Sequence, residues 1–140
     1  MLVETSEVEL FVAQAGKGEP LILIHGLGMS SALWINQISA FSQHFHTAAV
    51  DLRGFGQSSR PERPGDYAID VLAEDIATLI EQLEFDSCHI LGTSMGGFIA
   101  QALALAHPEL CRSLILCHTA PRMSMPSEVL ARRVKALGSM

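Results

Sequence analysis

Hydrophobic residues follow two spacings along this chain, and the two spacings alternate. Short continuous apolar runs are typical of parallel strands covered on both faces. These runs lie at 21–24, 47–50, 88–91 and 113–117. Between them, apolar residues recur at the spacing of an amphipathic helix. The helical stretches lie at about 31–43, 70–83, 98–106 and 127–137. Residues 7–13 instead alternate, which predicts a half-exposed antiparallel strand near the sheet edge.

The pattern also predicts which side chains of each helix face the core. Asp70 is expected to cap its helix, because a carboxylate at that position accepts from free backbone N–H groups. His89 lies inside an apolar run and is expected to face the core or a covering helix. The expected inward residues are Leu33, Trp34, Ile38 and Phe41 in the first helix, Leu72, Ile76, Leu79, Ile80 and Leu83 in the second, and Val129, Leu130, Val134 and Leu137 in the last.

Strands that alternate with helices predict an α/β fold built on a doubly wound, mostly parallel sheet. In such sheets ligands bind beyond the carboxyl ends of the strands. Each expected parallel strand is followed at that end by distinctive residues, and we expect these segments to meet at one rim. The segments are HGLG at 25–28, DLRG at 51–54, TS at 93–94 and HTAP at 118–121.

The segment GTSMGG at 92–97 fits the pattern G-x-S-x-G between an expected strand and an expected helix. A sharp strand-to-helix turn of this kind lifts a serine hydroxyl above the sheet, and its glycines let the backbone turn without a Cβ clash. The pattern therefore favours Ser94 as a nucleophile over Ser94 as an ordinary turn residue. Asp51 is interpreted differently, as an anchor of the 53–56 loop through hydrogen bonds.

These motifs, in this order, resemble the N-terminal half of an α/β-hydrolase: HGLG at 25–28, DLRGFGQSS at 51–59 and GTSMGG at 92–97. The elbow and the LCHTAP segment at 116–121 are most similar to 3-oxoadipate enol-lactonase-like and carboxylesterase-like members. The resemblance implies an α/β-hydrolase fold truncated after the strand that follows the nucleophile helix. It places the N-terminal part of the core at 1–122 and the start of a cap or lid-like helix at 123–140.

The resemblance also implies the chemistry of the site. Ser94 would attack an ester or lactone carbonyl and form an acyl-enzyme, and the backbone N–H groups of Leu27 and Met95 would form the oxyanion hole. His25, Gly26 and Gly28 would support the loop that carries Leu27. A small-molecule ester or lactone is the expected substrate class, with no cofactor and no metal. The paired His44 and His46 lack an evident third ligand.

The catalytic acid and histidine of such a triad follow the serine in chain order. In the family both come after later strands, and residues 1–140 do not reach either position. His118 ends the strand after the elbow strand and is the candidate within this chain, either as a base or as a pocket residue. Three functions stay open: a serine hydrolase seen in part, an oligomer that supplies the base in trans, and a binding or interaction module that lost the triad.

The composition of the chain limits the kinds of partner that it is expected to bind. The formal net charge of −6 argues against nucleic acid or an anionic membrane as the main partner. The start of the chain does not fit a signal peptide, and no apolar run is long enough to span a bilayer. Cys88, Cys111 and Cys117 read as reduced thiols in a cytoplasmic protein. The strand at 114–117 would leave an open edge, so we expect self-association through that edge or through the last helix.

Overall fold

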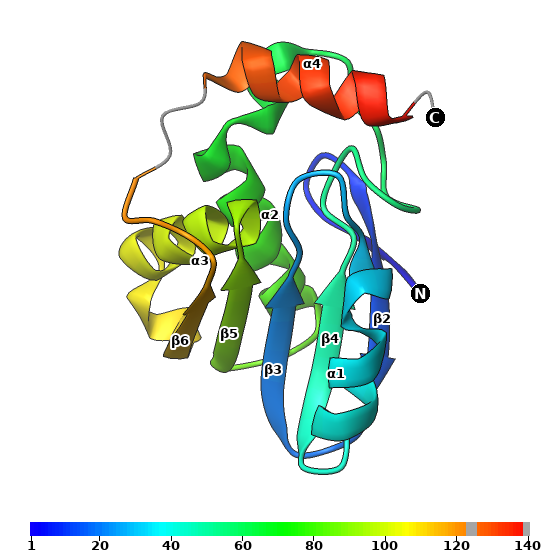
Figure 1. Ribbon diagram of the computed structural model, residues 1–140. Helices are drawn as coiled ribbons and strands as arrows, with labels where there is room; N and C mark the ends of the chain where they lie inside the picture. Colours follow the sequence, from blue (N-terminus) through cyan, green and yellow to red (C-terminus); the bar gives the residue numbers. More distant parts are fainter. Residues whose placement is uncertain (123–125, 139–140) are drawn as a thin grey trace.

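The computed structural model describes residues 1–122 and 126–138. These residues contain a six-stranded mixed sheet with the strand order β1-β2-β4-β3-β5-β6. Strands β3, β4, β5 and β6 run parallel, whereas β1 and β2 are antiparallel to their neighbours (Figure 1). The strands are β1 Leu2–Glu4, β2 Glu9–Ala15, β3 Glu19–Ile24, β4 Phe45–Val50, β5 Cys88–Thr93 and β6 Cys111–Cys117. The predicted doubly wound, mostly parallel sheet is confirmed.

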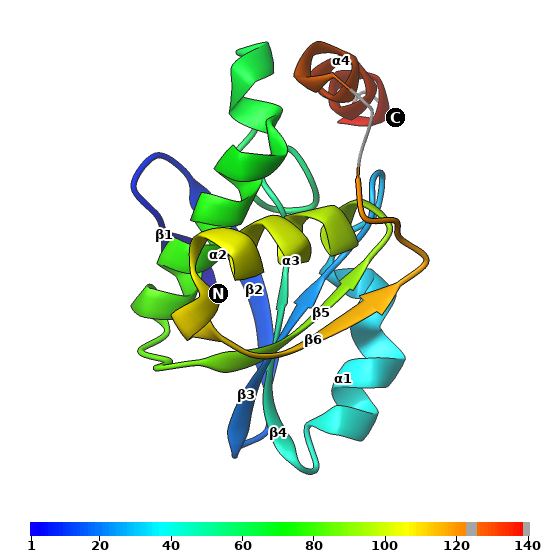
Figure 2. The ribbon, with the colours of Figure 1, turned by 90° about the vertical axis from the view of Figure 1, so that its left-hand side faces the viewer.

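Helices cover both faces of the sheet. Helix α1 and helix α2 lie on opposite sides, and α3 lies on the α2 side (Figure 2). Helix α4 crosses above the carboxyl ends of the parallel strands (Figure 1). The helices are α1 Ile35–Phe41, α2 Ile69–Gln82, α3 Met95–Ala106 and α4 Ser127–Gly138, with short 3-10 turns η1 Ser31–Trp34, η2 Pro64–Tyr67 and η3 Pro108–Leu110.

The larger core lies between the sheet and helices α2 and α3. Its fully buried side chains alternate along each strand, because successive residues of a strand point to opposite faces. Burying one such aliphatic side chain stabilises the fold by about 1.5–3 kcal/mol. Members of this core include Ile22, Ile24, Val50, Leu72, Ile76, Ile90 and Ile99. A smaller cluster on the α1 side holds Leu21, Leu23, Trp34, Ala49 and Leu91.

The start of the α1 region differs from the prediction. Residues 31–34 form a 3-10 turn capped by the Ser30 side chain, and only then does the α-helix begin. A 3-10 turn has three residues per turn, so the side-chain directions change where it meets the α-helix. Trp34 is buried as expected, but Leu33 is 42% exposed, and its predicted inward orientation was wrong.

Helix α2 begins at Ile69, two residues earlier than a cap at Asp70 predicts, and this changes the role of Asp70. Ala68 is the N-cap residue, and it makes no side-chain cap hydrogen bond. Asp70 lies in the first turn, so the predicted cap was wrong. A carboxylate there still interacts favourably with the partial positive charge of the helix N-terminus.

Three further predictions about burial need correction. Strand β6 was expected to be buried, but Leu114, Ile115 and Leu116 are 37–42% exposed because β6 is the edge strand of the described sheet. His89 was expected to face the core or a covering helix, yet its ring reaches the surface and contacts Glu19 and Ser113. In α4, Leu130 and Val134 are buried as predicted, whereas Val129 and Leu137 are 36% and 43% exposed.

The junction of α2 and α3 gives a pH-dependent prediction. His107 Nε2 lies 2.9 Å from Glu74 Oε1, and this hydrogen bond together with the charges of Glu74 and Glu109 raises the pKa of His107 above its ordinary 6.5. A raised pKa stabilises the fold below pH 6.5, and that contribution is lost as pH rises through the folded-state value. We expect His107→Gln to destabilise by about 0.5 kcal/mol at pH 5.5 and by less at pH 8.5 in denaturant titrations. In a Glu74→Gln background this pH dependence should shrink, and a difference that grows with pH would contradict the assignment.

Candidate active site

Ser94 occupies the turn between β5 and α3 in an unusual backbone conformation. Its φ is 52° and its ψ is −116°, and the residue is exposed. Non-glycine residues held at such angles cost on the order of 1–3 kcal/mol. Three hydrogen bonds fix the turn: the Ser94 N–H donates to Cys117 O at 2.9 Å, and Ser94 O accepts from Gly97 N–H at 3.0 Å and from Thr119 Oγ1 at 3.0 Å. The neighbouring strand β6 therefore helps to hold the serine in place.

Glycines beside Ser94 allow the backbones to approach closely. A Cβ on Gly96 would collide with Ile24 O and would lie 2.6 Å from His25 O, both at the end of β3. A Cβ on Gly97 would lie 2.6 Å from the Thr119 side chain. A methyl group on Gly26 would lie 3.2 Å from Ser94 Cβ, so the loop after β3 passes directly beside the serine.

His25 is buried under that loop and holds it through both ring nitrogens. Its Nε2 accepts from the Leu52 N–H at 3.1 Å, so Nδ1 carries the proton and donates to Gly26 O at 2.7 Å. Burial lowers the pKa of His25, which keeps the ring neutral in this arrangement. The ring also meets Phe55 edge to face, with centroids 5.3 Å apart.

The Asp51 carboxylate joins two loops at the rim. Oδ1 accepts from Ser31 N–H at 2.6 Å, and Oδ2 accepts from Gln57 N–H at 2.8 Å. A Cβ on Gly56 would collide with this carboxylate. The interpretation of Asp51 as a loop anchor is confirmed. Both of its carboxylate oxygens accept backbone hydrogen bonds, so its role is structural.

The structure contains a buried ion pair behind the rim that the sequence did not predict. Arg53 Nε and Nη2 donate to the two Asp75 carboxylate oxygens at 2.5 and 2.6 Å, and Arg53 Nη1 donates to Asp66 O at 3.3 Å. Both side chains are at most 5% exposed. Burial raises the pKa of Asp75, and the adjacent guanidinium counteracts that rise. The pair ties the loop after β4 to α2.

The four predicted rim segments do meet. Leu52 contacts His25, Gly26 contacts Ser94, and Ser94 contacts both Cys117 and Thr119, as the distances above show. Gly28 has a φ of 76°, and a Cβ there would lie 3.1 Å from Leu137 Cδ1, so α4 reaches the same loop. The site is thus assembled from β3, β4, β5 and β6.

The remaining predicted residues take defined positions. Met95 is the first residue of α3, where a backbone N–H has no acceptor within the helix. Leu27 is half-buried in the loop beside Ser94. His118 is exposed with a φ of 47°, and within residues 1–122 and 126–138 no hydrogen bond joins it to Ser94. Their catalytic roles stay predictions.

Other candidate chemistry is limited in the part of the chain that the structure describes. Groups of three or more His, Cys, Asp or Glu side chains placed to hold a metal ion do not occur among these residues. Cys88, Cys111 and Cys117 are free, and burial raises the pKa of Cys88 to about 12. Of the helices described, none has the length and apolar character needed to cross a membrane.

Residues 19–138 match the family described as alpha/beta hydrolase fold. The chain is 42% identical over 111 residues to a pimeloyl-[acyl-carrier protein] methyl ester esterase of Aeromonas salmonicida, covering 79% of this chain and 41% of the esterase. An epoxide hydrolase from Bacillus megaterium, solved with an inhibitor, superposes with a TM-score of 0.82 at 36% identity, covering 85% of this chain and 42% of that one. An enzyme that degrades N-acyl homoserine lactones superposes with a TM-score of 0.81 at 28% identity, covering 85% and 45%. The chain therefore spans about two fifths of the length of these relatives.

Proposed function

The chain belongs to the alpha/beta hydrolase fold family, and on that premise we propose that it is a serine hydrolase of carboxylic ester or lactone bonds. The observation that carries the proposal is Ser94 itself. It is exposed, stands at the sharp turn between β5 and α3, and is held at φ 52° beside the Gly26 loop. A strained conformation maintained by the surrounding structure is typical of a functional position.

In the proposed reaction Ser94 Oγ attacks the carbonyl carbon of the substrate and its proton passes to a base. The N–H groups of Leu27 and Met95 stabilise the oxygen anion of the tetrahedral intermediate, and each such donor is worth about 3–4 kcal/mol in related reactions. The N-terminus of α3 adds a favourable dipole at the same place. The alcohol leaves, an acyl ester on Ser94 remains, and water then hydrolyses it.

The residue at the elbow supports esters and lactones over epoxides as substrates, although both kinds of enzyme occur among the relatives. Attack of a serine oxygen on a carbonyl gives an ester, which water can cleave to release the acid. Attack of the same oxygen on an epoxide carbon would give an ether, which water does not cleave under mild conditions. Of these two substrate classes, only the acyl substrate gives an intermediate from which water can regenerate Ser94.

The base is the open part of the proposal. His118 is the candidate within this chain, and a histidine from the rest of a longer protein or from a second copy is the alternative. Loss of the triad histidine lowers turnover on the order of 10⁶-fold in a studied serine hydrolase. The oxyanion hole and substrate binding alone leave roughly 10³–10⁴-fold over water. We expect slow, Ser94-dependent acylation by the 140-residue chain.

We also propose that residues 1–122 are the N-terminal part of the hydrolase core and that 123–140 begin a cap, of which 123–125 and 139–140 lie outside the described residues. The buried Leu130 and Val134 of α4, packed over the rim, support this division. Self-association through the open edge of β6 is part of the proposal, because Leu114, Ile115 and Leu116 are 37–42% exposed there. The three free cysteines favour a reducing compartment such as the cytoplasm.

Labelling with a fluorophosphonate, followed by intact and native mass spectrometry, tests these points together. We expect one label per chain, lost in Ser94→Ala and kept in Ser39→Ala, an exposed serine on α1. A label that persists in Ser94→Ala contradicts the nucleophile. A chain that is never labelled contradicts His118 as the base and leaves a base from outside residues 1–140. A labelled chain that stays monomeric at micromolar concentration contradicts self-association and leaves the nucleophile standing.

A further inference from the structure

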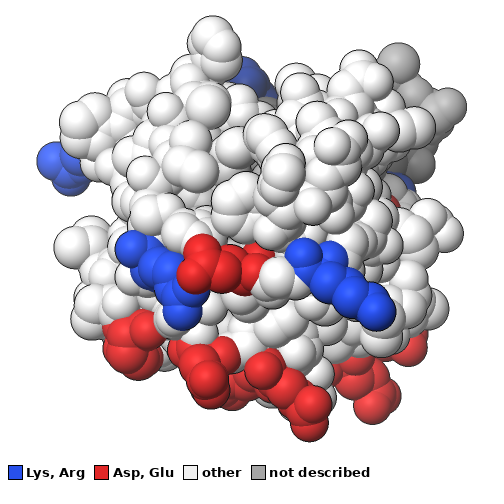
Figure 3. Space-filling view, turned by 90° about the horizontal axis from the view of Figure 1, so that it is seen from below, with Lys and Arg blue, Asp and Glu red and all other residues white. Residues whose placement is uncertain are grey.

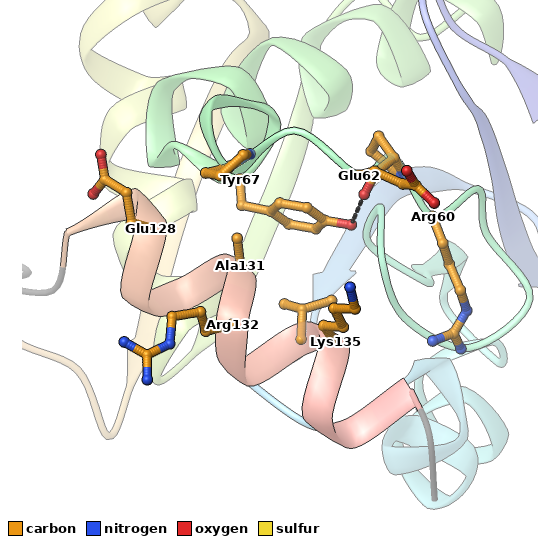
Figure 4. A pocket seen from close by; sticks show the side chains of 10 residues that line it. Arg60, Glu62, Tyr67, Glu128, Ala131, Arg132 and Lys135 are labelled. Carbon is orange, nitrogen blue, oxygen red and sulfur yellow. Dashed lines mark hydrogen bonds between the residues drawn. The ribbon is translucent and has the colours of Figure 1, made fainter.

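A cavity of about 370 Å³ lies between α4 and the 60–67 segment, away from Ser94, which does not line it. Figure 4 shows the Tyr67 ring facing α4 across this space, with Arg60 on the far side of Lys135. Helix α4 is fixed against the core at this point by Leu130 and Val134, which are 1% and 4% exposed. The cavity is thus a defined space between two packed elements.

One wall of the cavity is apolar. Its lining includes Tyr67, Ala131 and Val134. The Tyr67 hydroxyl donates to Pro61 O at 2.7 Å, so its polar group already has a partner, and burial raises its pKa. Tyr67 and Val134 are each 4% exposed, so most of the apolar surface open to a ligand belongs to the less buried Pro61, Pro64 and Ala131.

The end of the cavity near Lys135 is basic. Among residues 1–122 and 126–138, no ion pair joins Lys135 or Arg60 to a carboxylate, and Arg60 Nη2 donates only to the Gly56 carbonyl, at 3.2 Å. Glu62 also lines the cavity but pairs with neither cation. Glu128 lies seven residues from Lys135 along α4, about 10 Å along the helix axis.

The distribution of charge over the molecule also favours an anionic ligand at this basic end of the cavity. The chain has a net charge of −6, yet these cations stand together above the carboxyl ends of the strands. On the opposite side, seen from below, acidic side chains gather along one margin (Figure 3). A carboxylate approaching the cavity therefore meets cations whose charge is not neutralised by a direct partner.

We propose that this cavity binds an amphipathic monocarboxylate, with its carboxylate between Lys135 and Arg60 and its hydrocarbon against the apolar lining formed by Pro61, Pro64 and Ala131. Lys135 and Arg60 supply charge complementarity for one anionic group, and the apolar wall lies beside them. Arg132 also lines the cavity and, like them, has no ion pair among the described residues. The site does not include Ser94, so it stands independently of the proposed hydrolase chemistry.

A two-dimensional 1H–15N NMR titration of the 140-residue chain tests the proposal with octanoate, hexanoate and octanamide as probes. We expect octanoate to shift the amide signals of Ala131 and Lys135, and to bind about tenfold more tightly than hexanoate, because two further methylene groups are buried. Octanamide should bind at least fivefold more weakly, because it lacks the charge. Equal binding of octanoate and octanamide would overturn the proposal.

Variants locate the site and separate it from Ser94. Lys135→Gln is expected to raise the Kd for octanoate about fivefold, while Arg133→Gln, an exposed cation of the same helix outside the cavity, should change it less than twofold. Signal dispersion in the same spectra reports folding, and Arg60→Gln replaces Lys135→Gln if that variant unfolds. Equal effects of the Lys135 and Arg133 changes would overturn the assignment. Ser94→Ala should bind octanoate normally, so loss of labelling and loss of binding are distinguishable.

Discussion

Replacing Asp75 by alanine is expected to lower the free energy of unfolding by about 3–5 kcal/mol. The substitution removes the buried carboxylate partner of Arg53 and leaves its guanidinium only the exposed Glu7 carboxylate, 3.8 Å from Nη1. Arg53 is 2% exposed, and two of its nitrogens donate to Asp75 at 2.5 and 2.6 Å. Water cannot replace the lost partner at such burial without opening the packing between the loop and α2. Urea denaturation followed by the fluorescence of Trp34, the single tryptophan, measures the loss.

Two comparisons separate the buried pair from a general loss of charge on α2. Glu81→Ala removes an exposed carboxylate from the same helix and should change stability by no more than about 0.5 kcal/mol. The double variant Arg53→Met/Asp75→Leu removes both charges, and it should recover most of the stability that Asp75→Ala loses. An Asp75→Ala variant as stable as Glu81→Ala would show that the Arg53–Asp75 pair does not stabilise the fold.

The Arg53–Asp75 pair also marks where prediction from the sequence stops. The two residues are 22 positions apart, on a loop and on a helix, and no local pattern links them. Arginine and aspartate are mostly exposed in proteins, so burial of either is not expected from residue type. Only the packing of the 53–67 segment against α2 encloses them. Asp51 was easier to interpret, because it directly follows a buried strand and precedes a glycine-rich loop.

The strands were predictable because their signal is local. Continuous apolar runs identified β3, β4, β5 and β6 to within two residues at each end. Strand β1 was missed because three residues carry too little pattern. The open edge of β6 was predicted, but its continuous apolar run also placed it among the strands covered on both faces, and that part was wrong. Composition indicates that a segment is apolar, but whether a neighbour covers it depends on the rest of the fold, and in the described residues β6 is an edge.

The candidate site was predictable in position and less so in geometry. Ser94 is preceded by a strand, flanked by glycines and followed by a helix, and this order predicted the position of the serine. The rim segments also meet as expected. The directions of the Leu27 and Met95 N–H groups and the reach of His118 depend on backbone angles that residue identity does not determine. The positive φ of His118 is one such angle, since nothing in the HTAP segment requires it. For this reason the position of Ser94 carries the functional proposal.

A second large effect is expected for Gly96→Ala, and Gly65→Ala is its control. The control makes the same change from glycine to alanine at a position where the added Cβ meets no other atom. No atom lies within 4 Å of a Cβ built on Gly65, which is an exposed residue of the η2 turn. Alanine there should be neutral or stabilise by up to about 1 kcal/mol, because it restricts the unfolded chain. Helix propensity alone predicts the same sign for Gly96→Ala, since Gly96 lies within α3.

We expect Gly96→Ala to destabilise the fold by about 3 kcal/mol, against the sign that propensity predicts. Its Cβ would collide with Ile24 O and lie 2.6 Å from His25 O, and these are backbone atoms of β3 that cannot rotate away. The clash can be relieved only by unfolding or by moving α3 away from β3, and the second route shifts Ser94 relative to Gly26. Urea denaturation reports the first route, and the rate of fluorophosphonate labelling reports the second. Stability and labelling both equal to those of Gly65→Ala would contradict the close contact between α3 and β3 on which the geometry of the elbow depends.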